Sequence, residues 1–368
     1  MGTFRTNRLA YITKAKECYC MRTRILGTMT WILLVVSLLG WPAQAAGQTE
    51  ASKISNDWVV VHFPDDVDVP LDVQKAFLEG VTDSIRYIEG FFGSPLPKPV
   101  QYVFAESGRF YAMAKARPPY EIIDEGGVPT TVEMAKQRCI SLVTHELVHL
   151  HSFSTWGDYS FVSVSEGYAQ LVAMLRAQHP LHDTAAAFHE MDRLPPLRTL
   201  LTTGQSALES EWIPYLYSCM PSFLGFIYED FGYDVLIHVY NNIPPYTASS
   251  RTERLFALIE DSTATPLDEL ESKWRKMLGA MEVSERPIAT IELSYELADA
   301  GLFRLRMLSE HLGVEIDPAF REELQSILTD IDRYGWGEPV CCEELSGRIR
   351  RLSEWADEIC RDMLGTSE

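Results

Sequence analysis

The chain has 368 residues, 46% of them hydrophobic and 11% aromatic, and a formal net charge of −20 at pH 7. Its apolar content excludes an intrinsically disordered chain, and its length allows one large domain or two ordinary ones. An acidic surface repels nucleic acid and anionic lipid, so we exclude nucleic acid as a partner.

The N-terminal segment has the pattern of an export signal. Two basic residues precede an apolar run from Ile32 to Leu39, and residues 42–45 supply small side chains of the kind that signal peptidase recognises. We therefore expect a signal peptide at 1–45, with Met21 as an alternative start, and an exported chain, periplasmic or secreted. The uncharged stretch 25–41 approaches the length of a bilayer span, so an uncleaved membrane anchor is the alternative. Without such an anchor we expect no stable membrane partner.

The next part of the chain alternates strand and helix patterns. Apolar residues recur at helical spacing from Val73 to Ile88, whereas short β-branched and aromatic runs indicate strands. After a linker at 46–56 we expect a strand at 58–63, a helix at 71–92, a strand at 100–105 and a short helix at 108–116. The Pro- and Gly-rich stretch 117–131 then follows, and we expect it to supply a substrate-binding edge.

The remaining elements all have helical patterns. We expect a helix at 132–151, a polar loop at 152–160 and a helix at 163–178, followed by helices at 214–231, 234–241, 252–261, 266–279, 291–311, 318–334 and 341–364. The fold class is therefore α+β: residues 57–280 form a domain with a small sheet packed on the 132–151 helix and a mainly helical lower half. Residues 281–368 form a helical C-terminal region.

His145-Glu146-Leu147-Val148-His149 matches the H-E-x-x-H zinc pattern. Residues four apart lie on one face of a helix, so both imidazoles can reach one ion. Ile140, Val143, Leu147 and Leu150 form an apolar stripe on the opposite side. The alternative is two histidines that bind nothing. His151 lies well around the helix from the other two, and we leave it out of the site.

Catalytic zinc takes three protein ligands and keeps a fourth position for water, so a third ligand is required. The segment Val164-Ser-Glu-Gly-Tyr-Ala169 begins the next predicted helix, and Glu166 follows His149 by 17 residues. Together with H-E-x-x-H, this segment resembles the gluzincin metallopeptidases, in which the downstream ligand is written Glu-Gly-x-Ala. The resemblance covers about residues 56–280, is specific only from 145 to 169, and implies a zincin-like fold with Glu166 as the third zinc ligand.

Two alternatives concern Glu166. Ser163-Val-Ser-Glu166 also fits a capping box, in which Glu166 would only stabilise the helix start. Without Glu166, His182, His189 and nearby carboxylates are the remaining candidates. The sequence departs from the family at Ser163, where relatives often have Trp, and at Gln170, where some have an Asp that supports a histidine ligand, so the partner of the histidines stays open.

Two further residues have expected catalytic roles. Glu146 lies beside the ligands without being one, so we expect it to act as the general base that takes a proton from water. A segment from Tyr217 to Phe223 resembles the gluzincin helix in which a Tyr faces the metal. The resemblance implies Tyr217 as the oxyanion donor, with Tyr215 as the second candidate and core packing as the alternative role.

The expected function is hydrolysis of a peptide or protein substrate by a metallopeptidase with one Zn²⁺ per chain. An endopeptidase or a protease with few substrates is favoured, because the aminopeptidase signature Gly-x-Met-Glu-Asn is absent. One alternative is a non-catalytic zinc protein that binds partners through its acidic helical surface. The other is a metal-dependent amidohydrolase that acts on a non-peptide substrate.

Overall fold

The computed structural model describes residues 52–65, 67–105, 114–117, 120–124, 128–157, 161–203, 213–245, 248, 250–299, 317–335 and 340–364. The expected signal peptide at 1–45 lies outside these residues, and so does the apolar stretch 25–41. Among the helices of the described ranges, none combines the length and the apolarity needed to cross a membrane.

Five strands form one mixed sheet, in the order β1-β2-β3-β5-β4. They are β1 (Ser52–Ser55), β2 (Val59–Phe63), β3 (Val100–Phe104), β4 (Ala114–Arg117) and β5 (Glu121–Asp124). β2, β3 and β5 pair in parallel, while the edge strands β1 and β4 pair antiparallel to their neighbours. The expected strands at 58–63 and 100–105 are confirmed.

Two expectations in this region were wrong. Residues 52–55 belong to β1 and not to a linker, and residues 114–116 belong to β4 and not to a helix. Ala114 to Arg117 has no strong strand propensity, but all four residues pair with β5. Pairing with a neighbouring strand outweighs such weak local preferences.

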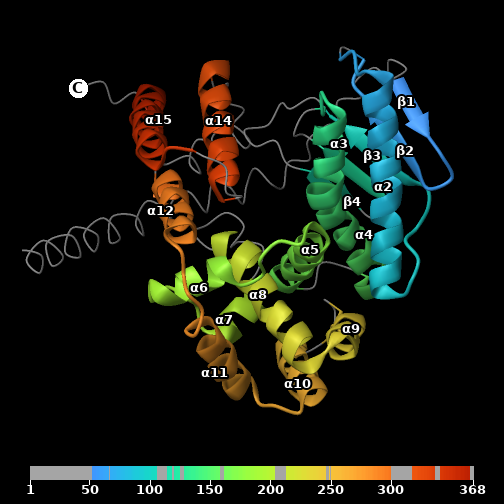
Figure 1. Ribbon diagram of the computed structural model, residues 1–368, viewed down its shortest axis with the longest axis vertical. Helices are drawn as coiled ribbons and strands as arrows, with labels where there is room; N and C mark the ends of the chain where they lie inside the picture. Colours follow the sequence, from blue (N-terminus) through green and yellow to red (C-terminus); the bar gives the residue numbers. More distant parts are fainter. Residues whose placement is uncertain are drawn as a thin grey trace, which may run out of the picture. The chain divides into compact units, whose positions relative to one another are not determined.

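Helix α2 (Leu71–Phe92) covers the sheet (Figure 1). Its apolar face, which includes Phe77, Val81 and Ile85, is fully buried. The inward residues of β2 and β3 alternate with half-buried ones, as expected when one face of a sheet lies on a core. The helix ends at Gly93, whose φ of 70° is the left-handed conformation that favours glycine at a helix end.

The expected helix at 132–151 exists but is longer and contains an irregular turn. It consists of α3 (Val132–Arg138), the π-helical turn η1 (Cys139–Val143) and α4 (Thr144–Trp156). Because a π turn contains more residues than an α turn, positions before it are rotated relative to those after it. Ile140, which we expect in the apolar stripe, is therefore only half-buried, and the neighbouring Cys139 is buried in its place.

A polar loop from residue 152 was also wrong, since α4 continues to Trp156. The hydroxyls of Ser152, Ser154 and Thr155 bond to carbonyls of the preceding turn, at 2.7–2.9 Å. The indole N–H of Trp156 donates to the Tyr240 carbonyl at 2.7 Å. These bonds satisfy polar groups that would otherwise favour a loop.

The lower half of the domain is helical, as expected. α5 (Val162–Ala177) turns back along α4 and packs closely on α8 (Ile213–Phe231). The other helices are α6 (Asp183–Glu190), α7 (Leu197–Thr202), α9 (Tyr233–Asn241), α10 (Arg251–Thr263) and α11 (Leu267–Leu278). The sequence patterns did not predict α6 and α7.

The C-terminal helices have a second hydrophobic cluster. α12 (Glu285–Asp299), α14 (Pro318–Gly335) and α15 (Cys342–Leu364) pack on one another around residues such as Leu293, Phe320 and Leu352. The main cluster extends from Val59 to Ile291. The change from one cluster to the other therefore falls within α12.

Candidate metal centre

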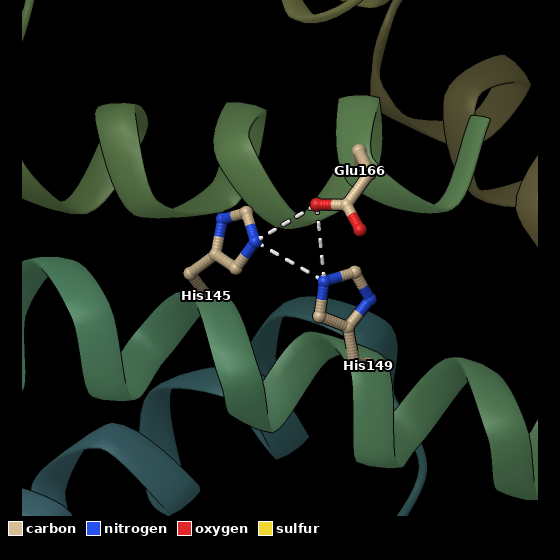
Figure 2. Close-up of side chains that lie close together, drawn as sticks. All are labelled: His145, His149 and Glu166. Atoms are coloured by element: carbon tan, nitrogen blue, oxygen red, sulfur yellow. Dashed lines mark hydrogen bonds and ion pairs between the residues drawn. The ribbon is translucent and has the colours of Figure 1, made fainter. Parts of the chain in front are cut away.

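His145, His149 and Glu166 converge between the antiparallel helices α4 and α5 (Figure 2). The two histidines lie one turn apart on α4, and Glu166 reaches them from the first turns of α5. Glu166 Oε2 lies 3.1 Å from His145 Nε2 and 3.3 Å from His149 Nε2, and the two Nε2 atoms are 3.1 Å apart. The three side chains thus place three ligand atoms at the corners of a nearly equilateral triangle.

The other ring nitrogen of each histidine has a partner on α5. His145 Nδ1 lies 3.2 Å from Gln170 Oε1, and His149 Nδ1 lies 3.0 Å from Ser165 Oγ. An imidazole that donates Nδ1–H to an amide oxygen such as Gln170 Oε1 has its lone pair at Nε2. This is the state in which an imidazole binds a metal, oriented by a partner behind it.

The triangle fits a metal ion. Zinc bonds of about 2.0–2.2 Å in tetrahedral geometry separate neighbouring ligand atoms by roughly 3.3–3.6 Å. The observed separations of 3.1–3.3 Å are close to that range. Both histidines are buried, and their Nε2 atoms and the Glu166 carboxylate lie close enough together for one cation to bind all three. His145, His149 and Glu166 therefore form a group that could hold a metal ion.

Electrostatics favour an ionised Glu166. Burial alone would raise its pKa, but the charge of His149 and the close contacts with both histidine rings outweigh that effect and hold the pKa well below its usual range. Glu166 is thus a carboxylate, which is the form that binds a metal.

The capping-box alternative for Glu166 was wrong. Helix α5 begins at Val162, its N-cap is Phe161, and no side chain caps it. Ser163 lies inside the first turn, and its hydroxyl is buried without a hydrogen-bond partner. Glu166 therefore points to the histidines and does not close a cap.

Glu146 is buried beside the triangle. The backbone N–H of Ala116, in β4, donates to Glu146 Oε2 at 2.8 Å. Burial raises the pKa of Glu146 to about 8; His145 opposes the rise and the charge of Glu166 adds to it. The sheet thus fixes this carboxyl group next to the candidate metal ligands.

Tyr217, on α8, also lies at the site. Its ring stacks on His145 with centroids 5.8 Å apart, and its hydroxyl is hydrogen-bonded to Glu166. Burial, followed by the charge and hydrogen bond of Glu166, raises the pKa of Tyr217 well above its usual value, so the hydroxyl stays a donor. The side chain of Tyr215, the second candidate, lies outside the described residues.

The other histidines considered from the sequence have different partners. His151 lies between Tyr240 and Ser94, bonded to each at 2.8 Å, and burial lowers its pKa to about 4, so it is neutral. His182 bonds to Ser222 and Glu229 through its two ring nitrogens. His189 lies on α6, outside the triangle. None of the three belongs to the metal group found among the described residues.

Sequence reasoning missed three supporting groups. The sequence marks Gln170 only as a departure from the family, yet its side chain contacts His145. No sequence pattern indicates Ser165 or the Ala116 N–H as partners of the site. Gln170 follows Glu166 by four residues and therefore shares its helix face, and that spacing could have indicated the contact.

Comparison with protein-family models, curated proteins and solved structures finds no match to this chain. The geometry of the site and the sequence pattern therefore carry the functional argument.

Proposed function

We propose that the protein is a zinc-dependent metallopeptidase of the gluzincin type. One observation carries the proposal: His145, His149 and Glu166 offer three ligand atoms 3.1–3.3 Å apart, and Glu146 lies buried directly beside them. A purely structural zinc site generally has four protein ligands, whereas a catalytic site has three and keeps one position open. The described residues supply three.

The expected chemistry is hydrolysis of an amide bond. His145, His149 and Glu166 would hold the zinc ion, which would supply Lewis-acid chemistry by lowering the pKa of a water molecule and polarising a carbonyl. Glu146 takes a proton from the attacking water and passes it to the leaving nitrogen. The Tyr217 hydroxyl turns from Glu166 to the negative charge that develops on the carbonyl oxygen. Gln170 and Ser165 keep the histidines oriented throughout.

A peptide is the favoured substrate because of the strand beside the site. β4 is one of the two edge strands of the described sheet and contacts α4 through the hydrogen bond from Ala116 to Glu146. Edge strands pair readily with an extended peptide, which would then lie along the catalytic carboxylate. β4 ends at Arg117, where the stretch 117–131 that is expected to supply a substrate-binding edge begins.

Turnover of a broad peptide library, with and without a chelator, tests the proposal. Cleavage that stops on chelation and returns with zinc is the expected result. Zinc bound at one per chain without cleavage of any peptide would instead support the binding protein. Hydrolysis confined to small non-peptide amides would support the amidohydrolase.

A further inference from the structure

The helix that carries the histidines has an irregular turn just before them. The π-helical η1 ends at Val143, two residues before His145. In a π turn the hydrogen bonds run from i to i+5, and such turns are frequent at functional sites. Cys139 is the first residue of the turn and is 1% exposed, so its carbonyl lies in a buried position. Buried carbonyls need donors, so partners from other elements are expected here.

Three polar side chains surround that carbonyl. Ser84 Oγ and Thr144 Oγ1 lie 2.9 and 2.8 Å from the Cys139 oxygen. Arg176 Nη1 lies 2.5 Å from Ser84 Oγ, 2.7 Å from Thr144 Oγ1 and 3.3 Å from the Cys139 oxygen. Because a guanidinium has only donors, the two hydroxyls accept from Arg176. Thr144 donates its own hydrogen to the Cys139 carbonyl, whereas the single Ser84 hydrogen is shared between the Cys139 carbonyl and the Gly80 carbonyl, which lies 2.8 Å away. Bonds from a charged donor of this kind are the strong ones.

The network joins three helices. Ser84 lies on α2, Thr144 is the first residue of α4, and Arg176 lies in the last turn of α5. Arg176 follows Glu166 by ten residues, which is about 15 Å along the helix at 1.5 Å per residue. Helix α5 is therefore attached to the histidine helix at two separated points, near Glu166 and at Arg176. A slide or rotation of α5 along α4 would break the second attachment.

We propose that Arg176 is a positioning residue for the metal centre. It fixes α5 against the π turn, through Ser84 and Thr144, so that the Glu166 carboxylate is already placed between both histidine Nε2 atoms when the ion arrives. Thr144 directly precedes His145, so the same bonds also fix the first histidine. This inference rests on the proposed zinc site and adds to it a residue that has no contact with the ion.

Zinc affinity tests the inference. The zinc-free full-length protein is titrated with zinc in competition with a coloured chelator, and the visible spectrum of the cobalt-loaded protein is recorded. Arg176→Met keeps most of the length of the side chain and removes every donor. Arg176→Lys keeps the charge. Arg86→Met is the matched control, because Arg86 lies on α2 in an exposed ion pair with Asp83.

We expect Arg176→Met to weaken zinc binding by about 10-fold or more, the range seen when supporting partners of ligands are lost. Its cobalt spectrum should change as well, because a displaced Glu166 alters the coordination geometry. Arg176→Lys should fall between Met and wild type, and Arg86→Met should match wild type. A merely structural role would lower the melting temperature and leave the affinity of the folded protein unchanged.

Three results would overturn the inference. The first is a folded Arg176→Met variant with wild-type zinc affinity and cobalt spectrum, which would leave the proposed function intact. If that variant does not fold, Ser84→Ala is tested instead, because it removes one of the two hydroxyls that bond to Arg176 and keeps Arg176 itself. Weaker zinc affinity of Ser84→Ala supports the inference. Wild-type zinc affinity of Ser84→Ala is the second result that would overturn it. The third result is a wild-type protein that binds no zinc, which would overturn the proposed function together with the inference.

Discussion

The backbone N–H of Ala116 donates to the carboxyl group of Glu146 at 2.8 Å, so the edge strand of the sheet holds the residue that follows the first histidine ligand. This bond joins the two layers of the domain at the candidate site. It also constrains what a substitution at Glu146 can do, because any replacement must accept the Ala116 hydrogen to keep the strand in place.

Glu146→Gln should remove the base and keep the structure. The amide oxygen of Gln can still accept from Ala116, so the fold and a zinc content near one per chain should persist. Peptide hydrolysis should fall by about 10²- to 10⁴-fold, the usual contribution of general acid–base catalysis. Metal analysis and turnover on one preparation measure both effects. Glu133→Gln, exposed on α3, is the control; activity retained in Glu146→Gln would show that Glu146 is not the base.

Tyr217→Phe should lower kcat with little change in KM. A hydroxyl that meets only the developing oxyanion acts in the transition state, and loss of one such donor reduces kcat by about 10²- to 10³-fold. The ring that stacks on His145 stays in place, so zinc content should be unchanged. Steady-state kinetics check the prediction, with Tyr228→Phe on the same helix as the control. Unchanged kinetics would assign Tyr217 to the core.

Much of the fold could be predicted because its helices have clear apolar faces. The pattern in α2 predicted both of its ends, and α5, α8 and α11 begin and end within a few residues of the expected positions. The failures depend on tertiary contacts. Strand β4 exists because it pairs with β5, and the end of α4 persists because its hydroxyls bond within the helix.

The convergence of the three candidate ligands could be predicted for a similar reason, and the prediction stopped at a similar limit. The four-residue spacing of His145 and His149 determines that they share a face, and the loop after α4 is short enough for Glu166 to return. The partners behind the ligands could not be predicted, because Gln170 and Arg176 meet α4 only through the packing of α5. The π turn at Cys139 has no sequence pattern that helical periodicity detects.

Gly167→Ala should disturb the packing that places Tyr217. A Cβ at Gly167 would lie 2.4 Å from Met220 Cγ on α8, one turn after Tyr217, so either the Met220 side chain or the helices must shift. Overpacking of this kind destabilises by about 1–3 kcal/mol. We expect a lower free energy of unfolding and a lower kcat, with zinc content near wild type.

The matched control for this variant is Gly90→Ala on α2. A Cβ at Gly90 meets nothing within 4 Å, so alanine should be neutral or stabilise the helix by up to about 1 kcal/mol. Chemical denaturation and kinetics of the two variants give the comparison. Wild-type stability and turnover in Gly167→Ala would show that α5 and α8 adjust without moving Tyr217.

Glu166→Gln separates metal ligation from a role of this residue at the helix start. The start of α5 has no side-chain cap, so the helix loses nothing there when the carboxylate becomes an amide. The metal triangle, however, loses its only anionic corner. We expect zinc affinity to fall by at least about 10²-fold, since zinc favours an ionised oxygen ligand over a neutral one. Peptide turnover should fall with it at limiting zinc.

Linkage provides an independent measure of the same loss. A metal that binds only the folded state stabilises it by about 4 kcal/mol when its free concentration is 1,000 times Kd. Zinc should therefore raise the free energy of unfolding of the wild type by several kcal/mol, and the rise should shrink by about 2.7 kcal/mol for a 10²-fold weaker Kd. Denaturation of the zinc-free and zinc-loaded forms, with helicity followed by circular dichroism, measures the difference.

The control is Glu190→Gln, which is exposed at the end of α6 and should behave as wild type. An equal zinc-induced rise in Glu166→Gln and wild type would remove Glu166 from the metal centre, because a carboxylate that binds the ion cannot be replaced without changing the energy of the loaded state.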